Sequence, residues 1–368
     1  MAEELRAGGR DDVVFVGTAN GLEAQLVPKA GIEFIPLPSR GFDRARPLTL
    51  FIAAWTALAS VFRGIGLIRE LKPDVVAGFG GYVSLPIGLA AFVCRVPVVL
   101  HEQNSVPGLA NRILGRWARR VAVTHPDSAA RFPHPERVTV TGNPVRRAVL
   151  EASAAEGRRR LGISEDAVML LVFGGSRGAR HLNQATVGLY ERLMQVPDLD
   201  VVHVTGAGEF ERVRDALAEK SGPDASRYHR YDYIHDMGDV VAAADLVVAR
   251  AGATSLAELT VLGRPCVLVP YPYATDDHQT GNARSVVEAG AAVLIPDAEL
   301  DSPRFGDELI RLLRDEGARA KMAQASARLG RPDAGRAVAD VVRATANNRA
   351  GTDAASVNAT SDERTSIS

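Results

Sequence analysis

The chain has 368 residues, enough for two domains that each bury a core of their own. Its 43 basic and 44 acidic residues argue against a nucleic-acid-binding protein, because that class carries a strong basic excess. Cys94 and Cys266 lie in apolar runs and are too few for a disulfide framework or a metal site, and the longest apolar stretch, 48–62, is too short to span a bilayer.

The first part of the chain alternates apolar runs of strand length with segments of helical periodicity. Residues 1–9 are typical of the last turns of an amphipathic helix closed by a glycine, and they lead straight into a strand at 13–16. Because a domain rarely begins partway along a helix, we expect the first domain to lack its first strand. Further strands are predicted at 33–37, 74–77, 98–101, 120–123 and 137–141, with helices at 50–71, 85–93 and 108–117.

A second alternating series follows the break at Asn143-Pro144 and a polar helix at 147–161. Its strands are predicted at 168–173, 200–205, 228–231, 246–249, 265–269 and 292–295. This alternation is typical of right-handed βαβ units and parallel sheets. We therefore predict an α/β protein of two Rossmann-like domains, at 1–143 and 144–344, with ligands bound in the crevice between them and a disordered polar tail at 345–368.

The stretch 246–282 concentrates residues that could bind a nucleotide sugar. An apolar strand ends at Arg250, and a turn of small residues from Gly252 to Ser255 opens a helix. The free N–H groups and dipole of such a terminus can receive a diphosphate. Glu258, in the first turn, could bind two ribose hydroxyls, and Gln279, in a polar loop, suits a hexose hydroxyl pair. Alternatively, Ser255 only caps the helix and Glu258 only complements its dipole.

Two other glycine-rich turns lie between a strand and a helix. Gly78 to Gly81 could approach a ligand's phosphates or simply form a tight turn. The second turn, Gly174-Gly175-Ser176-Arg177-Gly178, lacks the spacing of a dinucleotide-binding fingerprint, so no dinucleotide cofactor is expected. Ser176 with the neighbouring N–H groups would suit a diphosphate instead.

Polar residues also end a buried strand of the first domain, at His101-Glu102-Gln103-Asn104. Such a cluster at the carboxyl end of a strand favours a contact with a sugar or an acceptor, although a lone histidine is usually a core residue. Arg146, after the interdomain break, could bind a phosphate or be an ordinary surface arginine.

One helix of the first domain combines an apolar face with an arginine margin. The segment 48–68 carries Leu50, Phe51, Trp55 and Phe62, and arginines flank it. This pattern is typical of an interfacial helix on an anionic membrane, and the alternative is a helix that covers the sheet.

These motifs, in this order, resemble the MurG family, the bacterial peptidoglycan enzymes of glycosyltransferase family 28 that add N-acetylglucosamine to lipid I and have the GT-B fold. The matching segments span 17–283 and include GTANGLEAQLVPKAGIEF, KPDVVAGFGGYVSLP, HEQNSVPGLANR, TGNPVR, GGSRGARHLN, YIHDM, ARAGATSLAEL and DDHQTGNA.

The resemblance implies UDP-N-acetylglucosamine as donor, a lipid-linked acceptor, an anionic membrane surface as a partner, and a peripheral position on the cytoplasmic side of the cell membrane. It implies Ser176 at the diphosphate, Ile234 at the uracil and Gln279 at the sugar. Further donor contacts are implied for Asn104, Arg146, Ala253, Thr254, Ser255, Leu256, Ala257 and Glu258.

The sequence departs from the family in lacking its opening strand and glycine-rich loop, whose histidine is a candidate base. His101 or Glu102 is a substitute hypothesis for the base. The expected reaction is an inverting transfer in which main-chain N–H groups and the helix dipole stabilise the departing diphosphate, so that neither a metal nor a cofactor is required. The alternatives are a UDP-sugar 2-epimerase and a non-catalytic UDP-sugar-binding protein.

Overall fold

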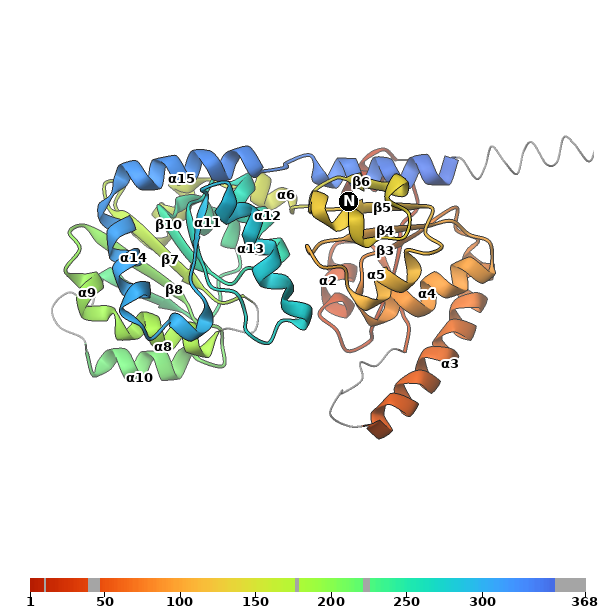
Figure 1. The fold of residues 1–368 in the computed structure, drawn as a ribbon, viewed down its shortest axis with the longest axis horizontal. Coiled ribbons are helices and arrows are strands. Elements are labelled where there is room, and N and C mark those ends of the chain that lie inside the picture. The colour runs from red at the N-terminus through yellow and green to blue at the C-terminus, as the bar shows by residue number, and fades with distance from the viewer. Residues whose placement is uncertain (10, 39–46, 176–178, 221–225, 348–368) are drawn as a thin grey trace, which may run out of the picture. The chain divides into compact units, whose positions relative to one another are not determined.

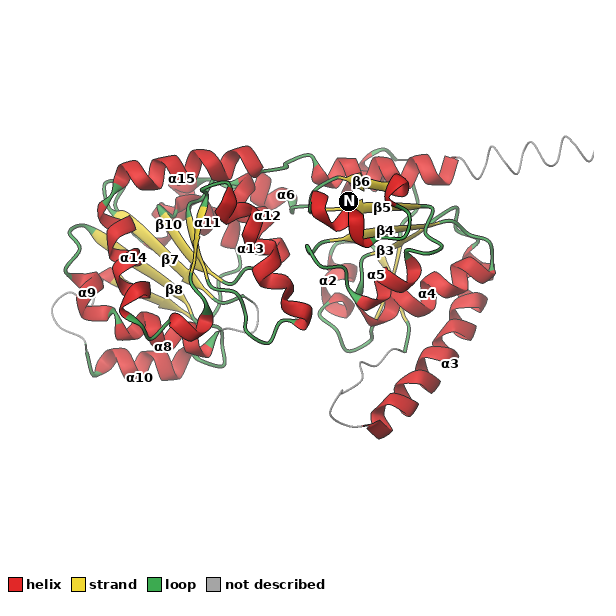
Figure 2. Cartoon of the chain, in the orientation of Figure 1, coloured by secondary structure: helices red, strands yellow, loops and turns green. Residues whose placement is uncertain are grey.

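The chain folds into two units in a computed structural model that describes residues 1–9, 11–38, 47–175, 179–220 and 226–347, without the side chains of 47–55 and 57. Unit 1 comprises Met1–Gly142 together with Asp333–Ser368, and unit 2 comprises Asn143–Pro332. Both are built from parallel strands and helices (Figure 1, Figure 2), which confirms the predicted α/β fold of two Rossmann-like domains.

The boundaries of the two units differ from the predicted domains in one respect. The predicted second domain runs to residue 344, whereas unit 2 ends at Pro332 and a final helix, 334–347, belongs to unit 1. Thr345, the first residue of the predicted tail, lies buried in this helix. Residues 348–368 lie outside the described part of the chain.

Unit 2 contains one six-stranded parallel sheet in the order β12-β11-β10-β7-β8-β9. From β7 the chain proceeds outward in one direction through β8 and β9, then returns to β10 on the other side of β7. The carboxyl ends of β7 and β10 are therefore the topological switch point, where open α/β sheets bind ligands. The strands are β7 (Val168–Phe173), β8 (Leu199–Val204), β9 (Tyr228–Tyr231), β10 (Leu246–Ala249), β11 (Cys266–Leu268) and β12 (Ala292–Leu294).

Helices cover both faces of this sheet because alternate residues of its strands are apolar on both sides. Leu170 and Val172 pack in one core with α8 (Arg180–Gly188), α9 (Tyr190–Met194), α10 (Phe210–Ala218) and α14 (Pro303–Arg314). Met169 and Leu171 pack in the other with α11 (Met237–Ala243), α12 (Ala253–Val261) and α13 (His278–Glu288). The helix α15 (Glu316–Leu329) contributes Ala325 and Leu329 to this second core.

The helix predicted at 147–161 is two helices, α6 (Arg147–Leu150) and α7 (Ala154–Leu161). Ser153 separates them because it caps α7, and its hydroxyl accepts a hydrogen bond from the Glu156 N–H at 3.4 Å. The Ser153 N–H donates to Asp239 Oδ1 at 2.8 Å rather than to Glu156, so this is a simple serine N-cap, a helix-start signal that interrupts the apparent periodicity.

The strands of unit 1 form two separate parallel sheets. One pairs β1 (Val14–Gly17) with β2 (Glu33–Pro36). The other has the order β3-β4-β5-β6 and consists of β3 (Val76–Gly78), β4 (Val98–Glu102), β5 (Arg120–Val123) and β6 (Val138–Val140). The connecting helices are α1 (Ala2–Ala7), α2 (Glu23–Lys29), α3 (Pro47–Leu71), α4 (Gly81–Val93), α5 (Leu109–Leu114), η1 (Pro126–Arg131) and η2 (Pro135–Arg137).

The core of unit 1 has two parts. On one side Leu100 of β4 packs with Ile68, Ile87 and Leu114, from α3, α4 and α5 respectively. On the other side Val99 packs with Leu5 of α1 and with Ala339 and Val342 of the helix 334–347. The last helix thus completes the cover of the four-stranded sheet.

The described side chains of α3 that enter the core lie in its carboxyl-terminal part, where Ile68 is buried, and the amino-terminal half of the helix extends away from the sheet (Figure 1). Leu58 and Phe62 are exposed on it. Across the described residues no helix combines the length and the apolar character needed to cross a bilayer.

Candidate functional site

The turn between β10 and α12 is open at the switch point of the unit 2 sheet. Gly252 is the N-cap of α12 with an extended backbone, and no side chain caps the helix. A Cβ built on Gly252 would come no closer than 3.9 Å to the Ser255 hydroxyl, and the Thr254 side chain is exposed. The first-turn N–H groups of Ala253, Thr254 and Ser255 therefore remain available to an anion, with the positive end of the helix dipole behind them.

Glu258 lies in the second turn of α12, not in the first turn as predicted, because the helix begins at Ala253, and it is held by Arg146. The Arg146 guanidinium donates to Glu258 Oε1 at 3.1 Å, and the carboxylate side chain is only 14% exposed, against 67% for the arginine. The sequence analysis treated these two residues as separate ligand contacts, and the structure brings them together in unit 2. This pairing fixes the position of the carboxylate while its arginine partner stays accessible.

Two residues that the sequence analysis did not single out hold the turn in place. The buried Asn282 of α13 donates to the Ala251 carbonyl at 3.3 Å. The buried Arg250 donates to the carbonyls of Val269 and Pro270, at 3.3 and 3.1 Å, and stacks over the Tyr271 ring. The sequence contained a signal for Arg250, since an arginine directly after a wholly apolar strand is expected to be buried. A buried charge requires partners.

Arg250 also takes part in an ion-paired network that reaches α8. It pairs with Asp297 of η5 (Asp297–Glu299), and the same carboxylate contacts His181 Nδ1 at 2.7 Å. His181 Nε2 lies 3.0 Å from Asp301. The hydrogen bonds with Asp297 and then Asp301 raise the pKa of His181 above its ordinary value. Through Asp297, His181 at the start of α8 is connected to Arg250, which precedes the α12 turn.

The other predicted donor contacts of unit 2 are distributed as follows. Gln279, in the first turn of α13, accepts a hydrogen bond from the Tyr271 N–H through Oε1 at 2.8 Å. Ile234, between β9 and α11, is half-buried against the core that includes α12. Leu256 is buried in that core, whereas Ala257 is half-buried. Ser176 lies outside the described residues.

The polar cluster after β4 in unit 1 is a hydrogen-bonded loop. Glu102 is buried, and its Oε1 accepts from the Asn104 N–H at 2.9 Å while its Oε2 accepts from the Gly108 N–H at 3.0 Å and the Asn111 amide at 2.8 Å. Both carboxylate oxygens are thus engaged. These contacts favour a role for Glu102 in shaping the loop that carries Asn104, rather than the role of a base.

His101 is enclosed in unit 1. Its Nε2 lies 3.0 Å from the Gly142 carbonyl, to which it must donate, and its ring packs 5.5 Å from that of Phe79. Burial lowers the pKa of His101 to about 4, so the imidazole is neutral at ordinary pH. A buried neutral ring that donates to a main-chain carbonyl is typical of a structural histidine.

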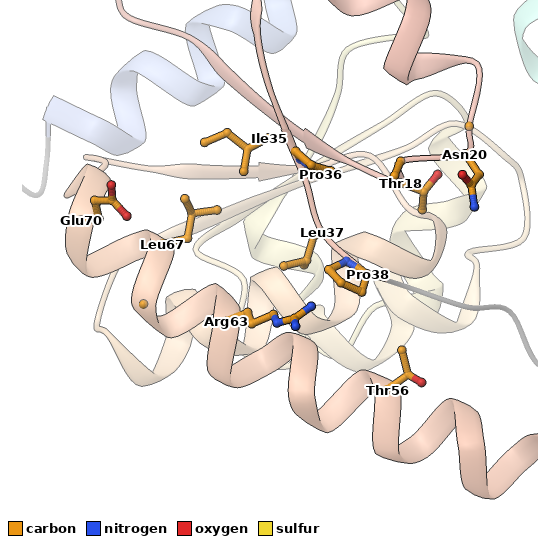
Figure 3. A pocket seen from close by; sticks show the side chains of 13 residues that line it. Thr18, Asn20, Ile35, Pro36, Leu37, Pro38, Thr56, Arg63, Leu67 and Glu70 are labelled. Carbon is orange, nitrogen blue, oxygen red and sulfur yellow. The ribbon is translucent and has the colours of Figure 1, made fainter.

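A cavity of about 920 Å³ opens in unit 1 beside α3. Its wall combines the turn after β1, the residues after β2 and one face of α3. Figure 3 shows apolar side chains along part of this wall and polar side chains along the rest. The apolar ones include Ile35, Leu37 and Leu67, and the polar ones include Thr18, Asn20, Arg63 and Glu70. The mixture suits an amphipathic ligand.

Two family models match the chain. Residues 1–123 match the glycosyltransferase family 28 N-terminal domain, and residues 169–338 match the glycosyltransferase family 28 C-terminal domain. The chain therefore belongs to glycosyltransferase family 28. The two domains of this family correspond to the two units of the structure, and the open α12 turn lies in the C-terminal one.

Two similar proteins of this family share the same name. A protein of Halothermothrix orenii is 39% identical over 351 residues, which is 94% of each chain, and one of Desulforudis audaxviator is 40% identical over 93% of this chain and 92% of its own. Each is named UDP-N-acetylglucosamine--N-acetylmuramyl-(pentapeptide) pyrophosphoryl-undecaprenol N-acetylglucosamine transferase.

Solved structures agree with this family assignment. The crystal structure of Acinetobacter baumannii MurG is 29% identical, with a TM-score of 0.73 and 93% of each chain covered. A UDP-GlcNAc 2-epimerase from Neisseria meningitidis, solved with UDP-GlcNAc bound, has a TM-score of 0.66 at 14% identity and covers 92% of this chain and 93% of its own. The second likeness concerns the fold alone.

Proposed function

We propose that this protein transfers N-acetylglucosamine from UDP-N-acetylglucosamine to undecaprenyl-pyrophosphoryl-N-acetylmuramyl-pentapeptide, lipid I, and so forms lipid II for peptidoglycan synthesis. The observation that carries the proposal is the uncapped α12 turn at the switch point, with the partly buried carboxylate of Glu258 near it. The name shared by relatives about 40% identical over nine-tenths of the chain supports this donor and this acceptor.

Unit 2 binds the donor in this proposal. The N–H groups of Ala253 to Ser255 receive the diphosphate, to which Ser176 also contributes, and Glu258 accepts hydrogen bonds from the two ribose hydroxyls. Ile234 borders the uracil and Gln279 contacts the sugar. Arg146 is close enough to Glu258, at 3.1 Å, to orient its carboxylate and to add positive charge near the nucleotide. Asn104 contributes from unit 1.

The proposed reaction is a single displacement at the anomeric carbon. The acceptor hydroxyl oxygen forms a bond to that carbon as the bond to the diphosphate oxygen breaks, and the hydroxyl proton passes to a base. UDP leaves with the bonding electrons. Fixed N–H groups that point at the departing diphosphate stabilise the charge that develops on it, and this stabilisation lowers the barrier.

Unit 1 holds the lipid-linked acceptor at an anionic membrane in this proposal, and the protein is peripheral on the cytoplasmic side of the cell membrane. The cavity beside α3 offers apolar walls for a prenyl chain and Arg63 for a phosphate. The exposed Phe62 and Leu58 on α3 support contact with lipid. The remaining predicted membrane residues, Leu50, Phe51 and Trp55, have side chains outside the described part of the structure.

The proposal is tested by incubating the full chain with UDP-N-acetylglucosamine labelled in the sugar and a lipid I analogue. The expected result is a labelled lipid-linked disaccharide and one UDP released for each disaccharide formed. Omitting the acceptor provides the control, because a transferase then releases little UDP.

Two other results would each reject the transferase. Conversion of the donor to its C2 epimer without an acceptor would indicate a UDP-sugar 2-epimerase. Tight binding of the donor without turnover, with the acceptor present, would indicate a protein that only binds UDP-sugars.

A further inference from the structure

His181, in the first turn of α8, contacts a carboxylate at each of its ring nitrogens. Its Nδ1 lies 2.7 Å from Asp297 Oδ2, and its Nε2 lies 3.0 Å from Asp301 Oδ2. The Asp297 side chain is 13% exposed and that of Asp301 is 77% exposed. A carboxylate accepts hydrogen bonds, so both ring nitrogens donate here, and only the protonated imidazole has two N–H groups. The geometry therefore fits the charged form of His181.

The neighbouring charged side chains on α8 and η5 form ion pairs that do not include this histidine. These pairs are Arg180–Glu209 at 3.0 Å and Glu299–Arg304 at 2.5 Å. Asp297 has a second partner in Arg250, whose Nη1 lies 2.5 Å from Asp297 Oδ1. Among the described residues, two cations and two carboxylates thus form one charge cluster, which consists of Arg250, protonated His181, Asp297 and Asp301.

Asp297 links the position of His181 to that of Arg250. The Arg250 side chain is only 8% exposed, and its Nε has no hydrogen-bond partner among the described residues. Its Nη1 makes the contact with Asp297 and also donates to the carbonyls of Val269 and Pro270. The place of this buried guanidinium therefore depends on the carboxylate that His181 holds from the other side.

The charge cluster joins three segments that contact the donor in the proposed function. His181 follows the segment between β7 and α8, to which Ser176 belongs. Arg250 directly precedes the α12 turn. The Arg250 guanidinium also lies 5.7 Å from the centre of the Tyr271 ring, and the Tyr271 N–H donates to Gln279 Oε1 at 2.8 Å. A change in the cluster is thus transmitted to all three segments.

We propose that His181 is a positioning residue of the donor site, and that its protonated form favours binding of the sugar nucleotide diphosphate. This inference rests on the proposed function. With His181 protonated the charge cluster is neutral, and loss of the proton to water leaves it with one net negative charge near the site of an anionic ligand. The neutral ring keeps one N–H, and its other nitrogen becomes an acceptor that faces a carboxylate.

The direction of the pH dependence follows from the two carboxylates. Their hydrogen bonds, first that of Asp297 and then that of Asp301, raise the pKa of His181 above its ordinary value of 6.5. The ring is therefore protonated in mildly acidic and neutral buffer and loses its proton in more alkaline buffer. Donor affinity should accordingly fall as the pH rises through the pKa of His181.

The test is a calorimetric titration of the full chain with UDP-N-acetylglucosamine at a series of pH values, from mildly acidic to mildly alkaline. Each phosphate of this donor is bonded on two sides and keeps one charge throughout, unlike a terminal phosphate, whose second pKa is about 6. The variants are H181Q, H181R and D301N. The control is H229Q, which removes a similar pair, because His229 Nε2 of β9 lies 2.7 Å from Asp200 of β8.

The parent and H229Q should bind the donor about threefold or more weakly at the alkaline end of the series. H181Q should bind with the weaker affinity at every pH, whereas H181R, which is always charged, should keep the tighter affinity throughout. D301N removes one of the two carboxylates that stabilise the charged ring, so its transition should lie at lower pH. Because Asp301 is exposed, D301N also carries the test if H181Q does not fold, which thermal unfolding shows.

A pH profile of H181Q that matches that of the parent would overturn the proposal, because another group, such as His278 beside Gln279, would then be responsible. Donor binding by the parent that does not change with pH would overturn it as well, and would leave the proposed function intact. Absence of donor binding by the parent at every pH would reject the proposed function and this inference together.

Discussion

At the scale of single residues, the pair Arg146–Glu258 supports the proposed nucleotide site over an ordinary helix start. Glu258 could have been a first-turn acid that only complements the helix dipole, as the sequence alone allowed. In the structure its carboxylate is largely buried and oriented by an arginine from a distant part of the chain. Orientation of a partly buried carboxylate by a more exposed arginine favours recognition of a ligand over a general contribution to stability.

Glu258→Gln should therefore affect donor binding much more than folding. We expect KM for UDP-N-acetylglucosamine to rise about tenfold, equivalent to about 1.4 kcal/mol, because the amide accepts hydrogen bonds from ribose hydroxyls less strongly. Loss of the pair with the exposed Arg146 should cost about 1 kcal/mol of unfolding free energy or less. Glu308→Gln, which breaks a similar pair with Arg311, is the matched control, and equal KM values for the two variants would contradict the assignment.

His181 provides a pH-dependent prediction. Its pKa is raised in the folded protein by hydrogen bonds with Asp297 and Asp301, so the protonated ring stabilises the fold. That contribution is complete below the unfolded-state pKa of 6.5 and is lost as the pH rises through the higher folded-state pKa. The difference in melting temperature between the parent and His181→Gln should accordingly be largest in mildly acidic buffer and shrink in alkaline buffer. A difference that grows with pH would show that the sign is wrong.

At the scale of elements, the helix 334–347 joins the end of the chain to its beginning. Arg343 pairs with Asp11 at 2.8 Å and donates to the carbonyls of Glu4 and Leu5, while Val342 is buried with Leu5 and Val99. The sequence analysis placed most of this helix in the second domain. Residues 330–333 separate it from α15, but a break between two helices does not show which core each of them packs against. Only the residues that Val342 and Arg343 contact show that this helix belongs to unit 1.

Val342→Ala should lower the unfolding free energy of unit 1 by about 1–3 kcal/mol, because it leaves a small void against α1 and β4. Donor binding by unit 2 should be unchanged. Arg336→Ala on the same helix is the control, since Arg336 is exposed. The measurement is denaturant unfolding together with UDP titration, and a stable Val342→Ala protein with impaired UDP binding would refute the placement of this helix.

The helix α3 is the element through which we propose that the protein contacts the membrane. Phe62→Ser should reduce sedimentation with phosphatidylglycerol vesicles about threefold or more, because it removes an exposed aromatic side chain from the face presented to lipid. Phe92→Ser is a matched control, since Phe92 is similarly exposed on α4 and packs on Trp117 instead. If both variants sediment like the parent, α3 is not the contact.

For the whole molecule, sequence periodicity was sufficient to predict the alternating strands and helices and the division near residue 143. It also predicted the turn at Gly252, because a run of small residues between an apolar strand and a helical pattern is typical of a strand-to-helix turn. It could not predict the roles of Asn282 and Arg250, since their partners, Ala251, Val269 and Pro270, are main-chain carbonyls whose positions depend on the folded sheet. The separation of β1 and β2 from the four-stranded sheet was likewise not readable from local pattern.

The central claim is that main-chain N–H groups at the start of α12 bind the diphosphate of the donor, with Glu258 on its ribose. Amide hydrogen exchange of the full chain, followed by mass spectrometry with and without saturating UDP, tests this directly. UDP should slow exchange most strongly in peptides covering 251–259, and Glu258→Gln should need a higher UDP concentration for the same protection. Saturating UDP that leaves 251–259 unprotected while protecting another part of the chain would contradict the account.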